Sequence, residues 1–311
     1  MARHVGTFGP GRGAGTAGKV GVMTTIVVGY DATPASEPAL AAALREAAST
    51  GAELRVVTVW RTAPYVGSVP GYGYDVLPPA EDLGRQLTTA AQSAVARLGS
   101  PDVEVSYDVG PGDPGTQLVA ASTTADLLVL GTRRHGALLS ALVGSATNYV
   151  LHHAQCPVLV VGPDAPAAWE RVVVGVDGSD CSLGALRWGA ARAEAAGCPL
   201  LVVNAWEVAA SPDAFGALAP DVSLYDKQVE AWLGEVVDLV LGARARVELR
   251  PVRATAAHAL VDAAGPGDLL VVGSRGRSGF ADLVLGSITM SVVHHAHCSV
   301  AVLRTGTGPT P

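Results

Sequence analysis

The sequence has few charged side chains, very few aromatic ones and no strongly basic stretch. Charged residues make up 16% of the 311 residues, aromatic residues make up 5%, and the formal net charge is −7. Without a basic cluster, nucleic acid is not expected as a main partner. No apolar run approaches the roughly 18 residues that a membrane-spanning helix needs, so no membrane partner is expected either.

Cysteine is also scarce, and its spacing argues against the common cysteine frameworks. The chain has four cysteines and no C-x-x-C pair among them: Cys156, Cys181, Cys198 and Cys298. Neither a zinc site nor a disulfide framework is therefore expected, and we assign no metal ligand. The N-terminal segment lacks an apolar signal core, so the sequence favours a reducing, cytoplasmic location.

What the chain does contain is a long internal repeat. Ile26-Val-Val-Gly-Tyr-Asp31 returns as Val172-Val-Val-Gly-Val-Asp177, at an offset of 146 (177 − 31). Further on, the segment at Gly131 returns at Gly273, at an offset of 142 (273 − 131). Two constant offsets that differ only slightly indicate one duplicated unit with a small length change in its middle. Repeats of this length are whole domains, which 311 residues can accommodate.

Within each unit, short apolar runs alternate with segments of helical periodicity. In the first unit we expect strands at 25–30, 54–60, 103–109, 126–130 and 158–161, helices at 36–50, 81–98, 114–123 and 145–154, and an irregular loop at 61–79. This alternation, with apolar strands, predicts a doubly wound α/β fold with a five-stranded, mainly parallel sheet in each of two tandem domains. We expect five regions: a flexible glycine-rich tail at 1–22, the first domain at 23–162, a linker at 163–170, the second domain at 171–304 and a flexible tail at 305–311.

A glycine-rich turn follows the apolar run Leu269–Val272 in the second unit. Gly273 and Gly276 permit positive φ and carry no Cβ that would hold a ligand away from the backbone. Gly286 and Ser287 come where the next helix begins, and the free N–H groups of a helix start suit a phosphate. The Ser287 hydroxyl can cap that helix or donate to the phosphate. The alternative is an ordinary strand–turn–helix connection without a ligand.

These residues give the chain a family resemblance: it resembles a tandem universal stress protein of the nucleotide-binding type. Members of that type carry Gly, two residues, Gly, nine residues, then Gly followed by Ser or Thr. The second unit matches in full, whereas the first has Arg134 in place of the second glycine. The resemblance implies flavodoxin-like domains, also described as adenine nucleotide alpha hydrolase-like, that bind ATP, with Mg²⁺ as an accompanying ion, and act in the stress response.

The resemblance also implies the site residues. An aspartate after the first strand serves the adenosine moiety, a residue near the end of the second strand offers its backbone to adenine, and the glycine turn with its arginine serves the phosphates. In the second unit these are Asp177, Ala205, Gly273, Arg275, Gly276, Gly286 and Ser287; in the first they are Asp31, Val59, Gly131, Arg133, Gly144 and Ser145. With Arg134 in the first turn, we expect unequal sites and tighter binding in the second unit.

Each of these residues also has a structural interpretation. Asp31 can cap the following helix, and Arg133 and Arg275 can be solvated turn residues. Trp60 and Trp206 can either wall an adenine pocket or pack in the core. For the pairs at 152–153 and 294–295, histidines next to each other on a helix cannot readily chelate one ion, so we expect them to complement the negative helix end.

Chemistry for fast phosphoryl transfer is missing from the sequence. No G-x-x-x-x-G-K-[ST] segment is present, so no lysine is placed against the β- and γ-phosphates. No paired carboxylates recur near the glycine turns, so a general base and a charge clamp are both lacking. We therefore expect a binding protein and no catalytic residue. A nucleotide-free interaction module and a slow ATP-hydrolysing or adenylate-transferring enzyme are the alternatives.

The closing strand of each unit is apolar and should lie at a sheet edge. These strands are Pro157–Val161 and Ser299–Leu303. Apolar edges are usually covered by pairing, so we expect the two strands to pair as an internal pseudo-dimer. The family resemblance allows a homodimer of chains as well, and the sequence names no downstream protein partner.

Overall fold

The computed structural model describes residues 24–61, 80–99, 102–132, 144–207, 222–242, 247–276 and 285–304. The expected tails at 1–22 and 305–311, and residues 62–79 of the expected loop, lie outside the described residues. The chain divides into two compact units between Pro163 and Asp164. Each unit is described by itself.

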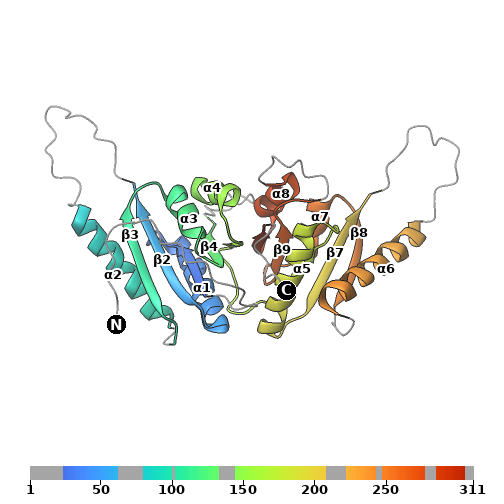
Figure 1. Cartoon of the computed structure of the whole chain (residues 1–311), viewed down its shortest axis with the longest axis horizontal. Coiled ribbons are helices and arrows are strands. Elements are labelled where there is room, and N and C mark those ends of the chain that lie inside the picture. The colour runs from blue at the N-terminus through green and yellow to red at the C-terminus, as the bar shows by residue number, and fades with distance from the viewer. Residues whose placement is uncertain are drawn as a thin grey trace, which may run out of the picture. The chain divides into compact units, whose positions relative to one another are not determined.

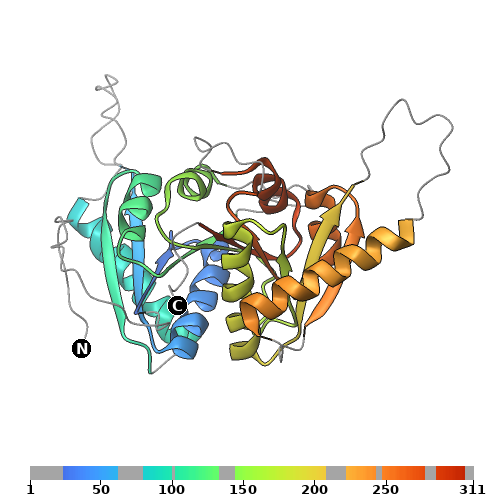
Figure 2. The same ribbon diagram turned by 45° about the vertical axis from the view of Figure 1, so that its right-hand side comes forward.

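The first unit is a five-stranded sheet in which every strand runs parallel to its neighbours. The strands have the order β3-β2-β1-β4-β5 and are β1 (Thr25–Gly29), β2 (Glu53–Trp60), β3 (Val105–Pro111), β4 (Leu127–Gly131) and β5 (Val158–Val161). Helices cover both faces (Figures 1 and 2): α1 (Glu37–Thr50) contacts α2 (Ala80–Leu98), and α3 (Pro114–Ser122) contacts α4 (Ser145–His153).

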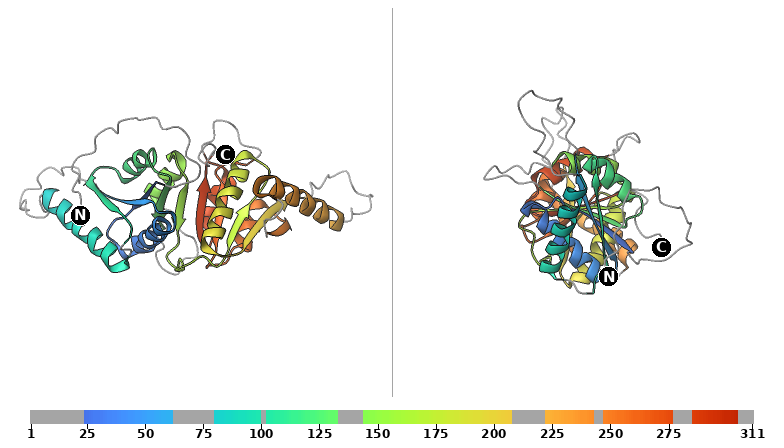
Figure 3. Two further views of the ribbon diagram at one scale, coloured as in Figure 1. Left: turned by 60° about the horizontal axis from the view of Figure 1, so that its bottom comes forward. Right: turned by 90° about the vertical axis from the view of Figure 1, so that its left-hand side faces the viewer.

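The second unit repeats this architecture. Its parallel strands have the order β10-β9-β6-β7-β8 and are β6 (Val172–Gly175), β7 (Leu200–Trp206), β8 (Glu248–Arg253), β9 (Leu269–Gly273) and β10 (Ser299–Leu303). Its helices are α5 (Asp180–Ala196), α6 (Val222–Leu241), α7 (Ala256–Ala263) and α8 (Ser287–His295). Helix α6 packs on β7 and β8 (Figure 3). The predicted tandem, doubly wound, parallel α/β fold is confirmed.

The central strands form because their residues suit burial on both faces. The side chains of Ile26, Val27 and Val28 in β1 are fully buried, and so are those of Val172, Val173 and Val174 in β6. β-branched residues favour the extended backbone, and strands covered by helices on both sides need continuous apolar runs. The helix that follows each of these strands ends at a glycine in the left-handed region, Gly51 at φ 70° and Gly197 at φ 63°.

Several element boundaries differ from the prediction, most of them by a single residue. The helix expected at 36–50 begins with a short 3₁₀ turn, η1 (Pro34–Ser36), before α1 starts at Glu37. The strand expected at 103–109 starts later, at Val105, and runs to Pro111. Its register explains this shift, because β3 follows β2 from the pair Leu54–Val105 to the pair Trp60–Pro111. The partner strand sets the ends of β3, which local sequence cannot reveal.

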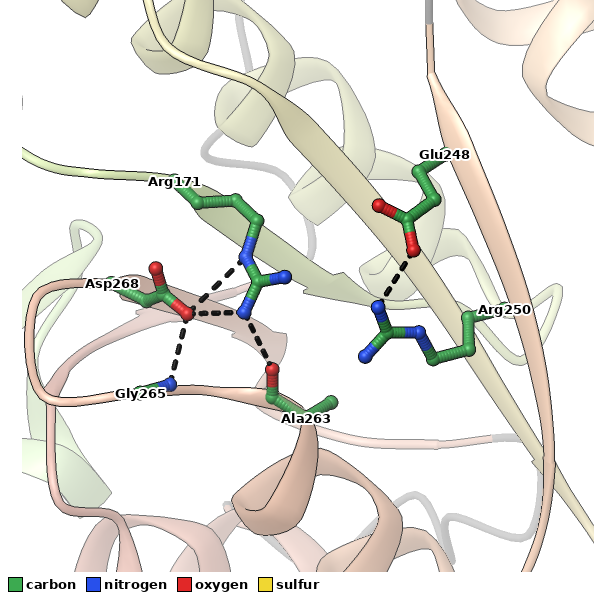
Figure 4. A network of polar contacts seen from close by, with 6 residues as sticks. All are labelled: Arg171, Glu248, Arg250, Ala263, Gly265 and Asp268. Atoms are coloured by element: carbon green, nitrogen blue, oxygen red, sulfur yellow. Dashed lines mark hydrogen bonds and ion pairs between the residues drawn. The ribbon is translucent and has the colours of Figure 1, made fainter.

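In each unit, an aspartate carboxylate accepts hydrogen bonds near the beginning of the central strands. In the first unit, Asp126 Oδ2 accepts from the backbone N–H of Thr24 at 2.7 Å and of Thr25 at 3.0 Å. In the second, Asp268 Oδ2 accepts from Arg171 Nη2 at 2.6 Å and from the Gly265 N–H at 2.9 Å (Figure 4). The two aspartates are related by the same offset as Gly131 and Gly273, so both units of the repeat have a carboxylate at this position. The opposite, carboxyl ends of the strands hold the candidate sites.

Candidate functional site

A cavity of about 390 Å³ lies at the carboxyl ends of the strands in the first unit. Among its walls are five of the predicted site residues: Asp31, Val59, Gly131, Gly144 and Ser145. They come from the ends of β1, β2 and β4 and from the start of α4. Ligands of doubly wound sheets bind at this edge, where the crossovers change direction. The predicted Arg133, together with Arg134, lies outside the described residues.

The second unit has a smaller cavity, of about 110 Å³, at the equivalent place. It is lined by five of the seven predicted residues: Asp177, Ala205, Gly273, Arg275 and Gly276. The other two, Gly286 and Ser287, stand at the start of α8 next to the lining residues Ile288 and Thr289. The repeat thus brings equivalent residues together at the same sheet edge in both units.

The two aspartates close a tight turn after the first strand of each unit. Asp31 Oδ1 accepts from the backbone N–H of Thr33 at 3.1 Å and from its hydroxyl at 2.6 Å. Asp177 Oδ1 accepts from the N–H of Ser179 at 3.0 Å and from its hydroxyl at 2.6 Å. Neither aspartate is the N-cap of the helix that follows, because Ser36 and Ser179 occupy those positions. One carboxylate oxygen therefore fixes the turn, and the side chain lines the pocket.

The glycines of the turns are required for space. Neither Gly273 nor Gly276 has a φ in the left-handed region, so positive φ is not what these positions need. A Cβ on Gly276 would instead lie 2.8 Å from Asp177 Oδ2, and one on Gly273 would lie 2.8 Å from Cys181 Cβ. In the first unit, a Cβ on Gly131 would lie 3.0 Å from the Ala35 carbonyl oxygen. The turn packs directly onto the aspartate loop in the second unit, where a side chain would separate them.

The last helix of each unit starts at the pocket with a glycine as its N-cap. Gly144 caps α4 and Gly286 caps α8, and neither cap uses a side-chain hydrogen bond. The Gly286 N–H donates to the Ser274 carbonyl at 2.8 Å, which ties the helix start to the glycine turn. The Thr289 hydroxyl donates to the Gly273 carbonyl at 2.8 Å and reinforces this tie. Ser287 is exposed and does not cap the helix.

An arginine that the sequence analysis did not single out lines the first pocket. Arg61 directly follows β2, and its Nη2 lies 2.8 Å from Asp113 Oδ2. Asp113 is the N-cap of α3, and its Oδ1 accepts from the Thr116 N–H at 3.1 Å. This backbone hydrogen bond, followed by the hydrogen bond from Arg61, holds the pKa of Asp113 below its usual value. The pair was missed because Arg61 is the first residue of the segment 61–79 that was interpreted as loop.

Threonines on the last helices were missed as well, although the repeat contains their signal. Thr147 and Thr289 are equivalent positions of the repeat, are both buried and line their respective pockets. Each stands on the first turn of its helix, shortly after the glycine that caps it. A search for identical residues at the repeat offset would have found them.

Trp60 and Trp206 pack against helices, and neither is among the described residues that line the two pockets. Trp206 Nε1 donates to Asp226 Oδ1 at 3.1 Å, and its ring stacks on Tyr225 of α6 with 5.8 Å between centroids. A Cβ on Gly84 of α2 would lie 3.4 Å from the Trp60 ring. Of the two interpretations of the tryptophans, packing is therefore the one that the structure supports.

The paired histidines stand in the last turns of α4 and α8. His152 Nδ1 lies 2.8 Å from the Asn148 carbonyl, and His295 Nδ1 lies 2.7 Å from the Ser291 carbonyl. Across the described ranges, no three His, Cys, Asp or Glu side chains gather as a metal site would require. Cys156, Cys181 and Cys298 are buried, and Cys198 is half-buried. In the described part of the chain, no helix has the length and apolarity to cross a membrane.

Comparison with known proteins establishes the family. The model of the Universal stress protein family matches residues 23–162 and 168–304, so this chain belongs to the universal stress protein family and carries its domain twice. A universal stress protein of Mycolicibacterium smegmatis is 32% identical over 291 residues, which cover 90% of this chain and 96% of that relative.

Solved structures with TM-scores of 0.59 to 0.64 agree on the fold. A universal stress protein from Archaeoglobus fulgidus, 18% identical, superimposes with a TM-score of 0.64 and covers 91% of this chain and 98% of its own. A universal stress protein solved in complex with cAMP is 33% identical, covers 44% of this chain and 97% of its own, and has a TM-score of 0.33.

Proposed function

We propose that this universal stress protein binds ATP or a related adenine nucleotide and acts as a regulatory protein of the stress response in the cytoplasm. The observation that carries the proposal is the repeated pocket. In both units the aspartate after the first strand, the residue near the end of the second strand and the first glycine of the turn line a cavity at the carboxyl ends of the strands.

The expected roles follow from the chemistry of these groups. The backbone of Val59 or Ala205 would hydrogen-bond adenine, and the carboxylate of Asp31 or Asp177 would accept from a ribose hydroxyl. The phosphates would lie against the glycine turn and the N-terminus of α4 or α8, where backbone N–H groups and the helix dipole favour negative charge. A Mg²⁺ ion would accompany the phosphates and neutralise part of their charge.

We further propose that the role is binding and not rapid catalysis. The described lining residues of each pocket include one carboxylate, Asp31 or Asp177, and no lysine or histidine. A single carboxylate engaged in a turn is a poor candidate for a general base, and no second acid stands opposite it among those lining residues. Rapid, repeated release of phosphate or pyrophosphate from added ATP would contradict this part of the proposal.

The proposed assembly is an internal pseudo-dimer of the two domains through their apolar closing strands, with a homodimer of chains as a further level. The support is the apolar sequence of Pro157–Val161 and Ser299–Leu303, because such edges are usually covered by pairing.

The test is mass spectrometry of the small molecules that the purified chain releases on denaturation. The proposal predicts an adenine nucleotide in amounts comparable to the protein, or uptake of ATP by protein that was isolated empty. A chain that carries no nucleotide and takes up none would favour a nucleotide-free interaction module. Arg134, in the place of a glycine, favours that alternative for the first unit alone.

A further inference from the structure

The two pockets differ at one repeat position on the first turn of the last helix. Ala146 and Ile288 are related by the same offset as Gly144 and Gly286, and each lines the pocket of its own unit. Ile288 is 45% exposed, although its neighbour Thr289 is buried and bonded to the Gly273 carbonyl. The core therefore does not require this isoleucine, and its side chain is available to whatever fills the pocket.

Position 288 lies where the phosphates of the proposed nucleotide would bind. The first N–H groups of a helix lack partners within the helix. In α8 the Gly286 N–H already donates to the Ser274 carbonyl, so an anion would meet the next amides, those of Ser287 and Ile288. The branched Ile288 side chain stands beside these amides, whereas the first unit has only the methyl group of Ala146.

We propose that this residue sets the length of the phosphate chain that each pocket accepts. Ile288 selects a nucleoside monophosphate in the second unit, and Ala146 admits a triphosphate in the first. This inference rests on the proposed nucleotide binding. It concerns the preference between chain lengths at each site and is independent of the overall affinity of that site.

Two further differences between the pockets point the same way. The cavity is about 390 Å³ in the first unit and about 110 Å³ in the second. The guanidinium of Arg61 lines the first pocket, and the equivalent position, which directly follows Trp206 as Arg61 follows Trp60, is Glu207. A longer phosphate chain carries more negative charge, which the Arg61 cation of the first pocket attracts, and the second unit has no cation at that repeat position.

Calorimetry with ATP and AMP tests the inference on the second site, with Asp31→Ala as the background that disables the first. We expect AMP to bind about tenfold more tightly than ATP, in the range that one or two carbon atoms produce in a shaped pocket. Ile288→Ala should bring the two dissociation constants close together. Leu239→Ala, which truncates an apolar side chain that is 83% exposed on α6, is the matched control and should leave their ratio unchanged.

The converse exchange is Ala146→Ile in the Asp177→Ala background, where any ATP binding at the first site should weaken more than AMP binding. A ratio at the second site that Ile288→Ala does not alter, with both nucleotides still bound, would overturn the inference and leave the proposed function standing. Absence of binding by the unmutated chain would refute both.

Discussion

At the scale of single residues, the site depends on a close approach between a glycine and a carboxylate. Gly276 lies so near Asp177 that a Cβ would come within 2.8 Å of Oδ2, while Oδ1 is held by the N–H and hydroxyl of Ser179. The carboxylate cannot swing away without breaking its turn. Substitution at position 276 must therefore disturb the aspartate, the turn or both.

Gly276→Arg is accordingly expected to abolish nucleotide binding in the second unit, a loss of at least about a hundredfold in affinity, as misplacement of a binding group produces. The fold should persist, because the turn lies at the sheet edge. Gly184→Arg is the matched control, since a Cβ at that position on α5 has nothing within 4 Å. Calorimetry with ATP in the Asp31→Ala background measures the effect, and undiminished affinity in folded Gly276→Arg protein would place the phosphate site elsewhere.

Asp113 gives the first unit a pH-dependent contribution to stability. Its pKa is lowered chiefly by the Thr116 N–H and then by Arg61. The pKa of Asp113 is lower in the folded state than in the unfolded state, so the ionised carboxylate stabilises the fold. This stabilisation is fully present above the ordinary carboxyl pKa, about 4, and is lost as the pH falls through the folded-state pKa. Urea unfolding of wild type and Asp113→Asn should differ at neutral pH and converge under acid conditions.

The order of causes can be checked with Arg61→Ala. The hydrogen bond from the Thr116 N–H is the larger cause of the lowered Asp113 pKa. The stability of Arg61→Ala should therefore still fall with acid by most of the amount that separates wild type from Asp113→Asn. Loss of the whole difference on removal of Arg61 would show that the ion pair dominates.

At the scale of elements, a carboxylate binds the start of the central strands in each unit. In the second unit this buried ion pair can be compared with an exposed one (Figure 4). The Asp268 side chain is 6% exposed and pairs with Arg171 at 2.6 Å. Glu248 and Arg250 pair at the same distance on the surface of β8, with side chains 56% and 40% exposed. Burial distinguishes the two pairs.

Asp268→Ala should lower the free energy of unfolding by about 3 kcal/mol, because it leaves the Arg171 guanidinium and the Gly265 N–H without their carboxylate acceptor. Glu248→Ala should cost less than about 1 kcal/mol, as expected for an exposed pair. Chemical denaturation of both variants measures this. Equal losses would mean that Asp268 contributes no more than a surface residue.

The elements were largely predictable because their signals are local. Continuous β-branched runs, helical periodicity and glycine stops such as Gly51 are properties of neighbouring residues. The start of β3 at Val105 was not predictable, since pairing with Leu54 sets it. The packing of Trp206 on Tyr225 could not be foreseen either, because a strand's last residue can turn to a helix or to the pocket.

The candidate site was predictable to the extent that the repeat marks it. Equivalent residues such as Asp31 and Asp177 stand out at a constant offset. The Arg61–Asp113 pair has no counterpart in the second unit, where Glu207 and Thr255 occupy those positions, so the repeat gave no signal for it. The steric requirement for glycine at position 276 could not be predicted either, because the Asp177 carboxylate that a side chain would contact is distant in sequence.

At the scale of the whole molecule, the sequence predicts that the two closing strands cover each other. Hydrogen exchange of the full chain can test this. We expect the backbone amides of β5 and β10 to exchange as slowly as those of the central strands β1 and β6. Rapid exchange of every second amide along both closing strands, the pattern of an open sheet edge, would contradict the internal pseudo-dimer.

The central claim, that each unit binds adenine nucleotide through its aspartate at the sheet edge, is tested most directly by calorimetric titration of the nucleotide-stripped chain with ATP. The wild type should bind at two sites, one lost in Asp177→Ala and the other in Asp31→Ala, and the double variant should bind none. Absence of binding by the wild type, or binding by the double variant equal to that of the wild type, would contradict the account.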